Sequence, residues 1–347
     1  MLLSLFVVFT ITGCSLIQQE YEYVAEEFMM DTFVKLKVYD ADKAKAEEVA
    51  QKALDEFKRI ELLTNRYAQE GTAEYAKSDV IKLNLAAGHS PVQVDKDVLA
   101  MLSLCKKYNK EFDGAFDVTI GPVVDLWGFG TEKKSVPSDE KLEERLELVD
   151  SNKMVLDEEK GTAYLVKEKM SLDLGGIAKG YATEQAAQLL RDDGIKKALI
   201  NAGGNIYAIG EKDKNIPWMI GIQDPRNPDK IIGILKLKDQ VAVTSGDYQR
   251  YFEVDGKRYH HILDPRTGKP ASNMMSVTVV ADNSALADIL STSFFVMGVE
   301  QSLAYIAEHP GVEAVFVTQD KRIIYSPGLE GVIELEKDGG YKIDQGR

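Results

Sequence analysis

The amino-acid sequence predicts an α+β fold with mixed or antiparallel sheets and packed helices. Segments with helical periodicity occur in both halves of the chain, and short apolar segments bounded by turn residues are frequent in the second half. The dipeptide Asp255-Gly256 is typical of a type I′ turn between two antiparallel strands. Because hairpins and helical crossovers both connect the strands, the pattern favours α+β over a doubly wound parallel sheet.

The first half of the chain is predicted to contain a strand followed by two helices. Apolar and lysine residues alternate over residues 33–38, with the period of a half-buried strand. Apolar residues recur with helical spacing over residues 46–60, and Asp40 or Asp42 is placed to cap this helix. The same spacing predicts a second helix over residues 97–112.

The second half is predicted to be richer in strands, which are short, apolar and separated by turn residues. These strands cover residues 170–174, 198–202, 218–222, 231–237, 241–244, 251–254 and 276–280. Helices are predicted over residues 177–191, 284–297 and 298–308. The charged segment 131–150 contains Pro137 and is predicted to be a surface excursion rather than a domain linker.

The charge balance limits the classes of function. The chain has 42 Lys and Arg against 56 Asp and Glu, which gives a formal net charge of −14. Nucleic acids are bound by clustered cationic side chains, and because the sequence shows no basic cluster we expect no nucleic-acid partner. A negatively charged ligand would need positive charge supplied locally. Two cysteines exclude a disulfide framework, and Cys105 is predicted to be a buried core thiol.

The amino terminus is predicted to be an export signal. Residues 2–11 are apolar but too few to span a bilayer as a helix, which takes about 20 residues, and are typical of a signal peptide. The tetrad Ile11-Thr12-Gly13-Cys14 resembles a bacterial lipobox, which implies a signal peptide over residues 1–13 and a lipid on Cys14. Charged and polar residues follow at once, which disfavours a buried strand, although no Lys or Arg precedes the apolar run. We expect residues 14–24 to be a tether and the folded part to be extracytoplasmic, lipid-anchored to the cell membrane.

A glycine pair lies between a predicted strand and a predicted helix, in the segment from Ser171 to Gly180. Gly175 and Gly176 let the backbone approach a ligand closely, and the free N–H groups at a helix start favour an anion such as phosphate. The spacing matches neither the dinucleotide-binding fingerprint nor a Walker A loop. A glycine turn with a purely structural role is the alternative.

A carboxylate and a hydroxyl share one face of the helix predicted over residues 284–297. Asp288 and Thr292 are four residues apart, and Ile289 and Val296 indicate that this face is buried. A buried carboxylate is costly unless it is paired or binds a metal, and carboxylate with hydroxyl oxygen suits Mg²⁺. An ion pair between Asp288 and a nearby Lys or Arg is the alternative.

Two of the four histidines, His260 and His261, follow the predicted hairpin. The other two, His89 and His309, stand alone in unrelated segments, which disfavours a zinc site. Imidazole titrates near neutral pH, so an acid/base role fits better. A strand-end histidine with a satisfied hydrogen bond is the structural alternative.

Taken together, these motifs resemble the ApbE family of flavin transferases, the FAD:protein FMN transferases. The matching segments follow the family's order from about residue 30 to residue 298. Besides the three above, they are Met30-Asp31-Thr32, Ser78-Asp79-Val80 with Asn84, Phe116 to Pro122 with Leu126 to Phe129, Asn201 to Asn205, Ile222 to Pro225, and Thr244 to Tyr248. Asp31 departs from the pattern, because the family usually has Gly there.

The resemblance implies one flavin transferase domain over residues 25–340, built from two intertwined subdomains of the ApbE-like type. It also implies that Mg²⁺ binds the pyrophosphate of FAD, and that FMN passes to a Thr or Ser hydroxyl of another protein through a phosphoester, with release of AMP. The implied metal ligands are the Gly176 carbonyl and the Asp288 and Thr292 side chains. The implied FAD contacts are Met30, Tyr67, Ala115, Phe116, Asp117, Asp173, Lys179 and Ile262.

The catalytic base implied by the resemblance is His261. Of the two adjacent histidines, only His261 matches the family pattern His-Ile-x-Asp-Pro-x-Thr-Gly. Arg266 is not counted as catalytic, because a salt bridge to Asp264 explains it equally well. The implied acceptors are subunits of membrane electron-transport complexes of the sodium-pumping quinone reductase or Rnf type.

Two other functions use the same residues differently. A Mg²⁺-dependent FAD pyrophosphatase would have water as the nucleophile and would release FMN and AMP. A non-catalytic flavin-binding lipoprotein would store or deliver flavin, and it would not need Asp288, Thr292 and His261 together.

Overall fold

The computed structural model describes residues 20–336 and 339–346. The predicted signal peptide and Cys14 lie outside these residues. The first described element is β1 (Tyr21–Met29), which pairs antiparallel with β2 (Thr32–Asp40). Strand β1 therefore begins inside the segment expected to be a tether. Its exposed face carries charged side chains such as Glu22 and Glu26, which concealed the strand pattern.

Both halves of the chain contribute to one nine-stranded mixed sheet, in the order β1-β2-β6-β7-β10-β15-β16-β17-β19. All neighbours in this main sheet are antiparallel except β17 and β19. The second half supplies β6 (Lys197–Ala202), β7 (Asn205–Ile209), β10 (Gln240–Gly246), β15 (Met274–Ala281), β16 (Glu313–Thr318), β17 (Arg322–Tyr325) and β19 (Lys342–Gln345). This arrangement confirms the predicted α+β class.

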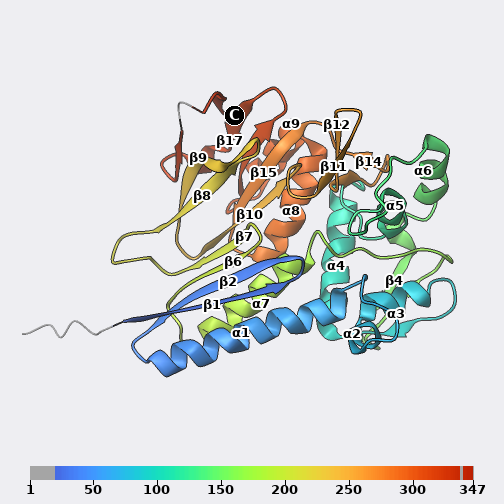
Figure 1. Cartoon of the computed structure of the whole chain (residues 1–347), viewed down its shortest axis with the longest axis horizontal. Helices are drawn as coiled ribbons and strands as arrows, with labels where there is room; N and C mark the ends of the chain where they lie inside the picture. Colours follow the sequence, from blue (N-terminus) through green and yellow to red (C-terminus); the bar gives the residue numbers. More distant parts are fainter. Residues whose placement is uncertain (1–19, 337–338, 347) are drawn as a thin grey trace, which may run out of the picture.

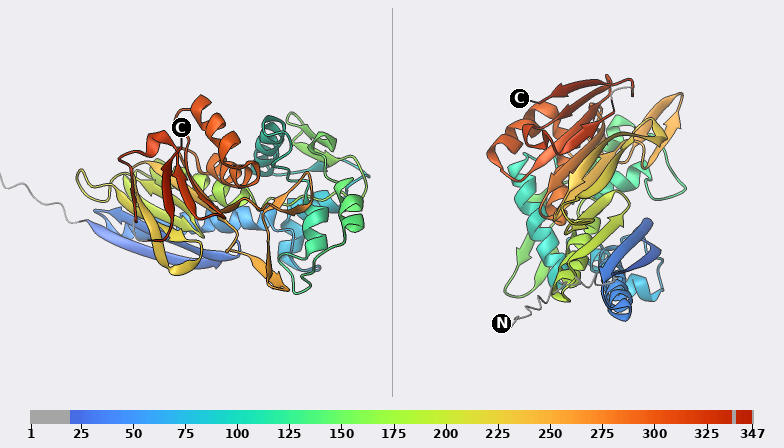
Figure 2. Two further views of the ribbon diagram at one scale, coloured as in Figure 1. Left: turned by 90° about the horizontal axis from the view of Figure 1, so that it is seen from above. Right: turned by 90° about the vertical axis from the view of Figure 1, so that its left-hand side faces the viewer.

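Helices from both halves cover one face of the main sheet (Figures 1 and 2). They are α1 (Lys43–Thr64), α4 (Lys96–Glu111), α7 (Ala178–Asp192), α8 (Ser284–Met297) and α9 (Val299–Glu308). Helix α1 lies against α7, so the two halves are intertwined as the resemblance implied. The N-terminal cap of α1 is Asp42 and not Asp40, because the Asp42 carboxylate accepts hydrogen bonds from the N–H groups of residues 44 and 45. Cys105 is buried in this core, as predicted. No helix of the described residues has the length and apolarity needed to cross a membrane.

A small sheet covers part of the opposite face of the main sheet. Its order is β18-β9-β8, formed by β8 (Trp218–Asp224), β9 (Asn227–Leu237) and β18 (Ile333–Leu335). Leu235 and Leu237 are buried against Ala242 and Val280 of the main sheet. Strand β8 forms the edge of this small sheet.

A third group of elements packs around Trp127. It contains α5 (Gly121–Trp127), α6 (Asp139–Leu146) and the hairpin of β11 (Tyr251–Val254) with β12 (Lys257–His260), followed by β13 (Leu263–Asp264) and β14 (Lys269–Pro270). Asp255 and Gly256 have φ of 52° and 74°, the left-handed values that the predicted type I′ turn needs. The predicted surface excursion contains α6, whose Leu142 is buried in this cluster.

The remaining short elements surround the carboxyl end of α1 and the end of α4 or lie near the carboxyl terminus. They are α2 (Ala73–Lys77), α3 (Asp79–Leu85), β3 (Val92–Gln93), η1 (Ser151–Lys153), β4 (Met154–Asp157), β5 (Thr162–Leu165) and η2 (Pro327–Leu329).

The strand predicted over residues 170–174 is wrong. Only an isolated bridge joins Ser171 to Ile120. Instead, the Leu172 N–H donates to the Asn84 side-chain oxygen at 2.7 Å, and the Asn84 amide nitrogen donates to the Leu172 carbonyl at 3.4 Å. The Asp173 N–H donates to the Val118 carbonyl at 2.8 Å. The segment satisfies its backbone groups in this way and not through a strand ladder. It delivers the glycine pair to the start of α7.

Candidate active site

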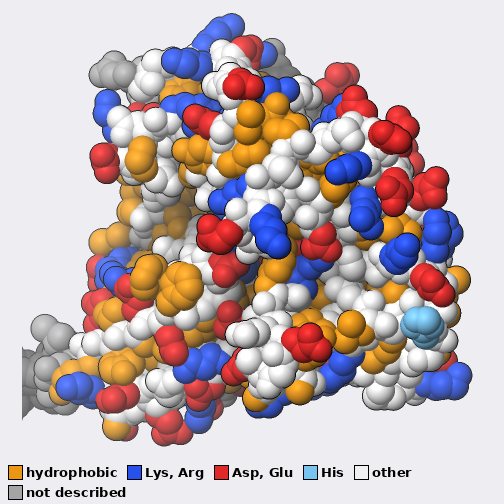
Figure 3. All heavy atoms as spheres, turned by 45° about the vertical axis from the view of Figure 1, so that its right-hand side comes forward, with side chains coloured by type: hydrophobic (Ala, Val, Ile, Leu, Met, Phe, Trp, Pro, Cys, Tyr) orange, Lys and Arg blue, Asp and Glu red, His pale blue; other side chains and the backbone are white. Residues whose placement is uncertain are grey.

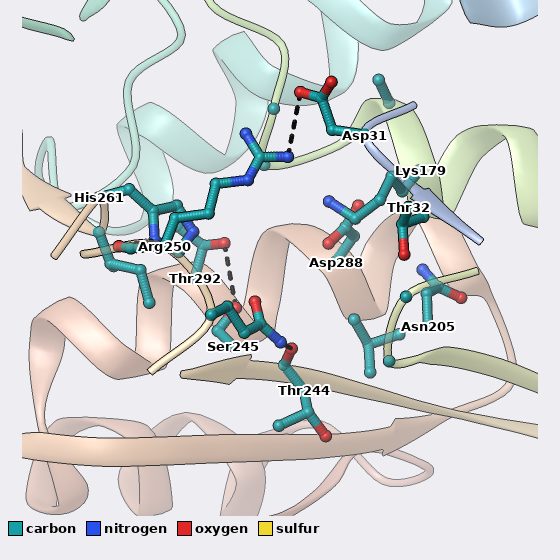
Figure 4. Close-up of a pocket in the computed structure, with 18 of the residues that line it drawn as sticks. Asp31, Thr32, Lys179, Asn205, Thr244, Ser245, Arg250, His261, Asp288 and Thr292 are labelled. Carbon is teal, nitrogen blue, oxygen red and sulfur yellow. Dashed lines mark hydrogen bonds and ion pairs between the residues drawn. The ribbon is translucent and has the colours of Figure 1, made fainter. Parts of the chain in front are cut away.

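A cavity of about 930 Å³ lies at one end of the main sheet. It is formed where the β1–β2 turn, the β6–β7 turn and the end of β10 meet the start of α7, the middle of α8 and the segment between β12 and β13. Every predicted site residue within the described part of the chain lines this cavity. Segments from most of the chain therefore meet at one place (Figure 4).

The glycine pair is held in place by Asp173 and Arg66. One Asp173 oxygen accepts a hydrogen bond from the Gly175 N–H at 2.9 Å, and the other lies 3.1 Å from an Arg66 nitrogen. The Arg66 side chain is only 8% exposed and also forms a two-pronged contact with Asp125, at 2.7 and 2.8 Å. The Tyr67 hydroxyl lies 3.5 Å from Asp173. The loop at the start of α7 is thus fixed by a buried guanidinium that the sequence did not reveal.

Asp288 is buried on α8, as predicted, with an exposed fraction of 5%. Its Oδ2 accepts a hydrogen bond from the Gly180 N–H at 2.8 Å, so its described partner is a backbone donor and not the ion pair considered as the alternative. Burial raises the pKa of the Asp288 carboxyl, and the nearby Lys179 ammonium acts in the opposite direction. A buried carboxyl of this kind gains from a cation beside it.

Thr292 and Gly176 come close to each other beside Asp288. A Cβ atom placed on Gly176 would lie 3.5 Å from the Thr292 Oγ1 and 2.9 Å from the Phe116 ring. The Thr292 hydroxyl also lies 3.5 Å from the Ser245 hydroxyl. Among the described residues no three His, Cys, Asp or Glu side chains converge, and Asp288 is the carboxylate beside Thr292 and Gly176. Carboxylate, hydroxyl and carbonyl oxygens fit Mg²⁺, which keeps several waters or phosphate oxygens.

Gly180 lets α7 approach α8 closely. A Cβ atom at this position would lie 2.4 Å from the Ser284 carbonyl oxygen and 2.5 Å from the Asp288 Cβ. We therefore expect Gly180→Ala to lower the free energy of unfolding by about 1–3 kcal/mol, because the two helices must separate. Chemical denaturation measures this change. Gln188→Ala, on the exposed side of α7, is the matched control and should be neutral; equal stability of both variants would contradict the close packing.

His261 faces the cavity in a defined tautomer. Its backbone N–H and its ring Nδ1 lie 3.1 and 3.2 Å from the Arg250 carbonyl oxygen. Because a carbonyl only accepts hydrogen bonds, Nδ1 carries the proton and Nε2 keeps a free lone pair. Removal from water, together with the Arg250 and Lys179 cations, lowers the pKa of His261 to about 3. The imidazole is therefore neutral at physiological pH, with no proton on Nε2.

His260 has the structural role considered above. Its side chain is buried against Phe295, and its Nε2 bonds the Ala271 carbonyl at 2.7 Å. The pattern that separated His261 from His260 therefore corresponds to a real difference in position.

Two cations, Lys179 and Arg250, reach the cavity of this acidic protein, whose lining also includes carboxylates such as Asp173 and Asp288. Lys179 lies in the first turn of α7, and the Arg250 side chain crosses the cavity to Asp31, with 3.3 Å between nitrogen and oxygen (Figure 4). Asp31 and Arg250 are 67% and 44% exposed, so this pair lies at the cavity mouth. Arg250 was not predicted as a site residue. Its place at the cavity becomes clear only from the fold, where its carbonyl contacts His261 and its side chain contacts Asp31. Arg266 pairs with Asp264 at 2.8 Å, in agreement with its exclusion from catalysis.

The other predicted contacts surround the same space. Met30, Ala115, Phe116 and Ile262 contribute apolar surface to the cavity. The Asp117 carboxylate is fully engaged by its neighbours, because it accepts hydrogen bonds from Thr119, Ser151 and Asn109. Asp117 thus shapes its loop, and a ligand would meet its backbone.

Comparison with known proteins places the chain among similar sequences and structures. Residues 30–316 match the family model described as the ApbE family. A protein of Klebsiella pneumoniae (strain 342) named FAD:protein FMN transferase is 39% identical over 308 residues, which cover 88% of this chain and 92% of that protein. One of the same name from Treponema pallidum (strain Nichols) is 36% identical, covering 89% and 88%.

Solved structures agree with these sequence matches. The crystal structure of the ApbE protein from Thermotoga maritima matches with a TM-score of 0.82 and 34% identity, covering 90% of this chain and 99% of that one. The flavin transferase ApbE from Vibrio cholerae matches with a TM-score of 0.75 and 28% identity, covering 87% and 94%. Because the family model covers most of the chain and relatives above 30% identity share its sequence and its fold, the chain belongs to the ApbE family.

Proposed function

We propose that this protein is an FAD:protein FMN transferase, which moves the FMN part of FAD to a Thr or Ser hydroxyl of an acceptor protein and releases AMP. The observation that carries this proposal is one cavity that unites Asp288, Thr292 and Gly176 with Lys179 and a neutral His261. Relatives across most of the chain length bear that name, which supports the same reaction here.

The reaction needs a new bond between the acceptor oxygen and the phosphorus of the FMN part, while the bond from that phosphorus to the bridging pyrophosphate oxygen breaks. Nε2 of His261 accepts the hydroxyl proton, and the Arg250 carbonyl keeps the ring oriented through Nδ1. The Lys179 ammonium, from the first turn of α7, holds phosphate oxygens. The leaving AMP carries away the electron pair of the broken bond.

The metal ligands in this proposal are the Asp288 carboxylate, the Thr292 hydroxyl and the Gly176 carbonyl. Bound Mg²⁺ would neutralise charge on the phosphate oxygens and on the leaving group. The chain's own contribution is to keep Asp288 buried and oriented by the Gly180 N–H, beside a helix start that already favours an anion.

We further propose that the protein is an extracytoplasmic lipoprotein, with its signal peptide over residues 1–13 and a lipid on Cys14. The first described strand begins only seven positions after Cys14, at Tyr21, so the anchor would keep the folded part of the chain close to the membrane. Acceptors in membrane electron-transport complexes of the sodium-pumping quinone reductase or Rnf type suit that location.

The first test is flavin fluorescence of the acceptor after denaturing electrophoresis. The protein is incubated with FAD, Mg²⁺ and an acceptor domain from such a complex. We expect a fluorescent acceptor band that disappears when EDTA removes Mg²⁺, because the pyrophosphate charge is then uncompensated. Free FMN and AMP without labelled acceptor would indicate a pyrophosphatase, and bound FAD without turnover would indicate a flavin-binding lipoprotein.

A further inference from the structure

The cavity has a wall that the proposed chemistry does not use. Strands β7 to β10 form this wall, which includes Ile206, Leu235, Ala242, Thr244 and the four residues 220–223. None of the described residues that these strands contribute to the lining is charged. All of the FAD contacts and metal ligands proposed above lie on other elements. This wall therefore offers space for a second, uncharged partner.

Strand β8 borders the cavity along its edge. Ile220, Gly221, Ile222 and Gln223 all line the cavity, although successive side chains of a strand point to opposite faces. A cavity that touches four consecutive residues must run along the strand and reach its backbone. Strand β8 pairs with β9 alone, and no other described residue hydrogen-bonds its backbone. Its outer N–H and C=O groups are thus free to pair with another strand.

The β1–β2 hairpin lies opposite this edge. Tyr39 of β2 packs against Trp218 of β8, with 6.0 Å between the ring centroids, so this face of β2 looks toward β8. Phe33 lies on the same face, six residues earlier, and contacts Phe28 with 5.3 Å between centroids. Both phenylalanines are 62% exposed and flank the three residues of the β1–β2 turn that line the cavity. Figure 3 shows hydrophobic side chains around a hollow in the surface.

We propose that an extended, uncharged segment of the acceptor polypeptide binds as an added strand on the free edge of β8 and so brings its Ser or Thr hydroxyl to His261. Hydrogen bonds from the β8 backbone would hold the segment, as in other cases of strand addition. The four β8 residues span about 13 Å at 3.3 Å per residue, enough for four residues of the partner. The inference rests on the transferase function proposed above.

Blocking the β8 edge tests this inference. In a Cys14→Ser background, where Cys105 is buried and protected, Gln223→Cys and Met219→Cys are each labelled with a bulky maleimide. Both residues are exposed on β8, but only Gln223 lines the cavity, so Met219 is the matched control. We expect the label at position 223 to reduce transfer to the acceptor domain at least tenfold with FAD affinity unchanged, and the label at 219 to have no effect.

The outcomes of the blocking experiment separate this inference from the function on which it rests. Full transfer by the protein labelled at position 223 would overturn the docking site, while transfer itself stands. A fall in FAD affinity would also overturn it, because this wall would then hold flavin. No transfer by the unlabelled protein would contradict the proposed function instead.

Amide hydrogen exchange tests strand addition directly. FAD-loaded protein is mixed with the acceptor domain in which the target Ser or Thr is replaced by Ala, so that the complex forms without turnover. We expect amides within residues 220–223 to exchange more slowly with the acceptor than with FAD alone. Unchanged exchange in β8, with slower exchange elsewhere on the surface, would place the acceptor at another site.

Discussion

Asp288→Asn should abolish flavin transfer at ordinary Mg²⁺ concentrations, with a loss of about a thousandfold or more in rate. The substitution keeps the shape of the side chain but removes the one carboxylate of the proposed metal site. Stabilisation of transition-state charge by a metal is worth several kcal/mol, and each 1.4 kcal/mol is about tenfold in rate. Acceptor-bound flavin fluorescence against time, at a series of Mg²⁺ concentrations, measures the loss.

The matched control for this variant is Asp97→Asn. Asp97 is also a buried carboxylate, but it pairs with Arg59 and Tyr181 away from the cavity. We expect it to lower the thermal unfolding midpoint while transfer by the folded protein persists. Unchanged transfer by Asp288→Asn would contradict the metal assignment. Partial recovery of the transfer rate of Asp288→Asn at high Mg²⁺ would support the assignment, because a metal site with lower affinity needs a higher Mg²⁺ concentration to be occupied.

His261→Ala should slow transfer by about 10²- to 10⁴-fold and leave FAD affinity nearly unchanged, as expected for loss of a general base. The pH dependence adds a second readout. Because the pKa of His261 is lowered to about 3, the native protein should lose no transfer activity through this group between pH 5.5 and 8. A base of ordinary pKa would lose activity as the pH falls through about 6.5. Single-turnover rates across this range, and FAD titrations at pH 7, measure both effects.

The same shift predicts how stability depends on pH. The unfolded chain protonates His261 near pH 6.5, whereas the folded chain holds the imidazole neutral until about pH 3. The unfolded state therefore binds the additional proton between these values, so this group makes the free energy of unfolding fall as the pH drops below about 6.5. His261→Ala should remove that part of the acid sensitivity.

His260→Gln is the control for the histidine variants. Its amide can still donate to the Ala271 carbonyl, so transfer should be retained with some loss of thermal stability. If both histidine variants lose FAD affinity equally, the role of His261 is structural and the assignment of the base is wrong.

Local sequence patterns predicted the elements that form the site. The spacing of apolar residues gave α8 its bounds, and the i, i+4 relation placed Asp288 and Thr292 on one face. The Asp255-Gly256 turn was predicted because its dihedral requirement depends on two residues alone. Family motifs then selected His261 over its neighbour, a choice that the hydrogen bonds of the two rings support.

Long-range contacts explain what the sequence could not reveal. Arg66 holds Asp173, which is 107 residues away, and Asp125, which is 59 residues away, so no local pattern marks it. Strand β1 was missed because its outer face pairs Glu26 with Lys35 and exposes polar side chains. The free edge of β8 could not be predicted from the sequence, because whether a strand lies at the edge of a sheet depends on the order of the strands in that sheet.

The most direct test of FMN transfer is tandem mass spectrometry of the acceptor after reaction with FAD and Mg²⁺, denaturation and proteolysis. The transferase account predicts one peptide that is heavier by FMN less one water, with the flavin attached through phosphate to a single Ser or Thr oxygen. It also predicts one AMP released for each modified acceptor. An unmodified acceptor, accompanied by free FMN and AMP, would contradict the account and identify water as the nucleophile.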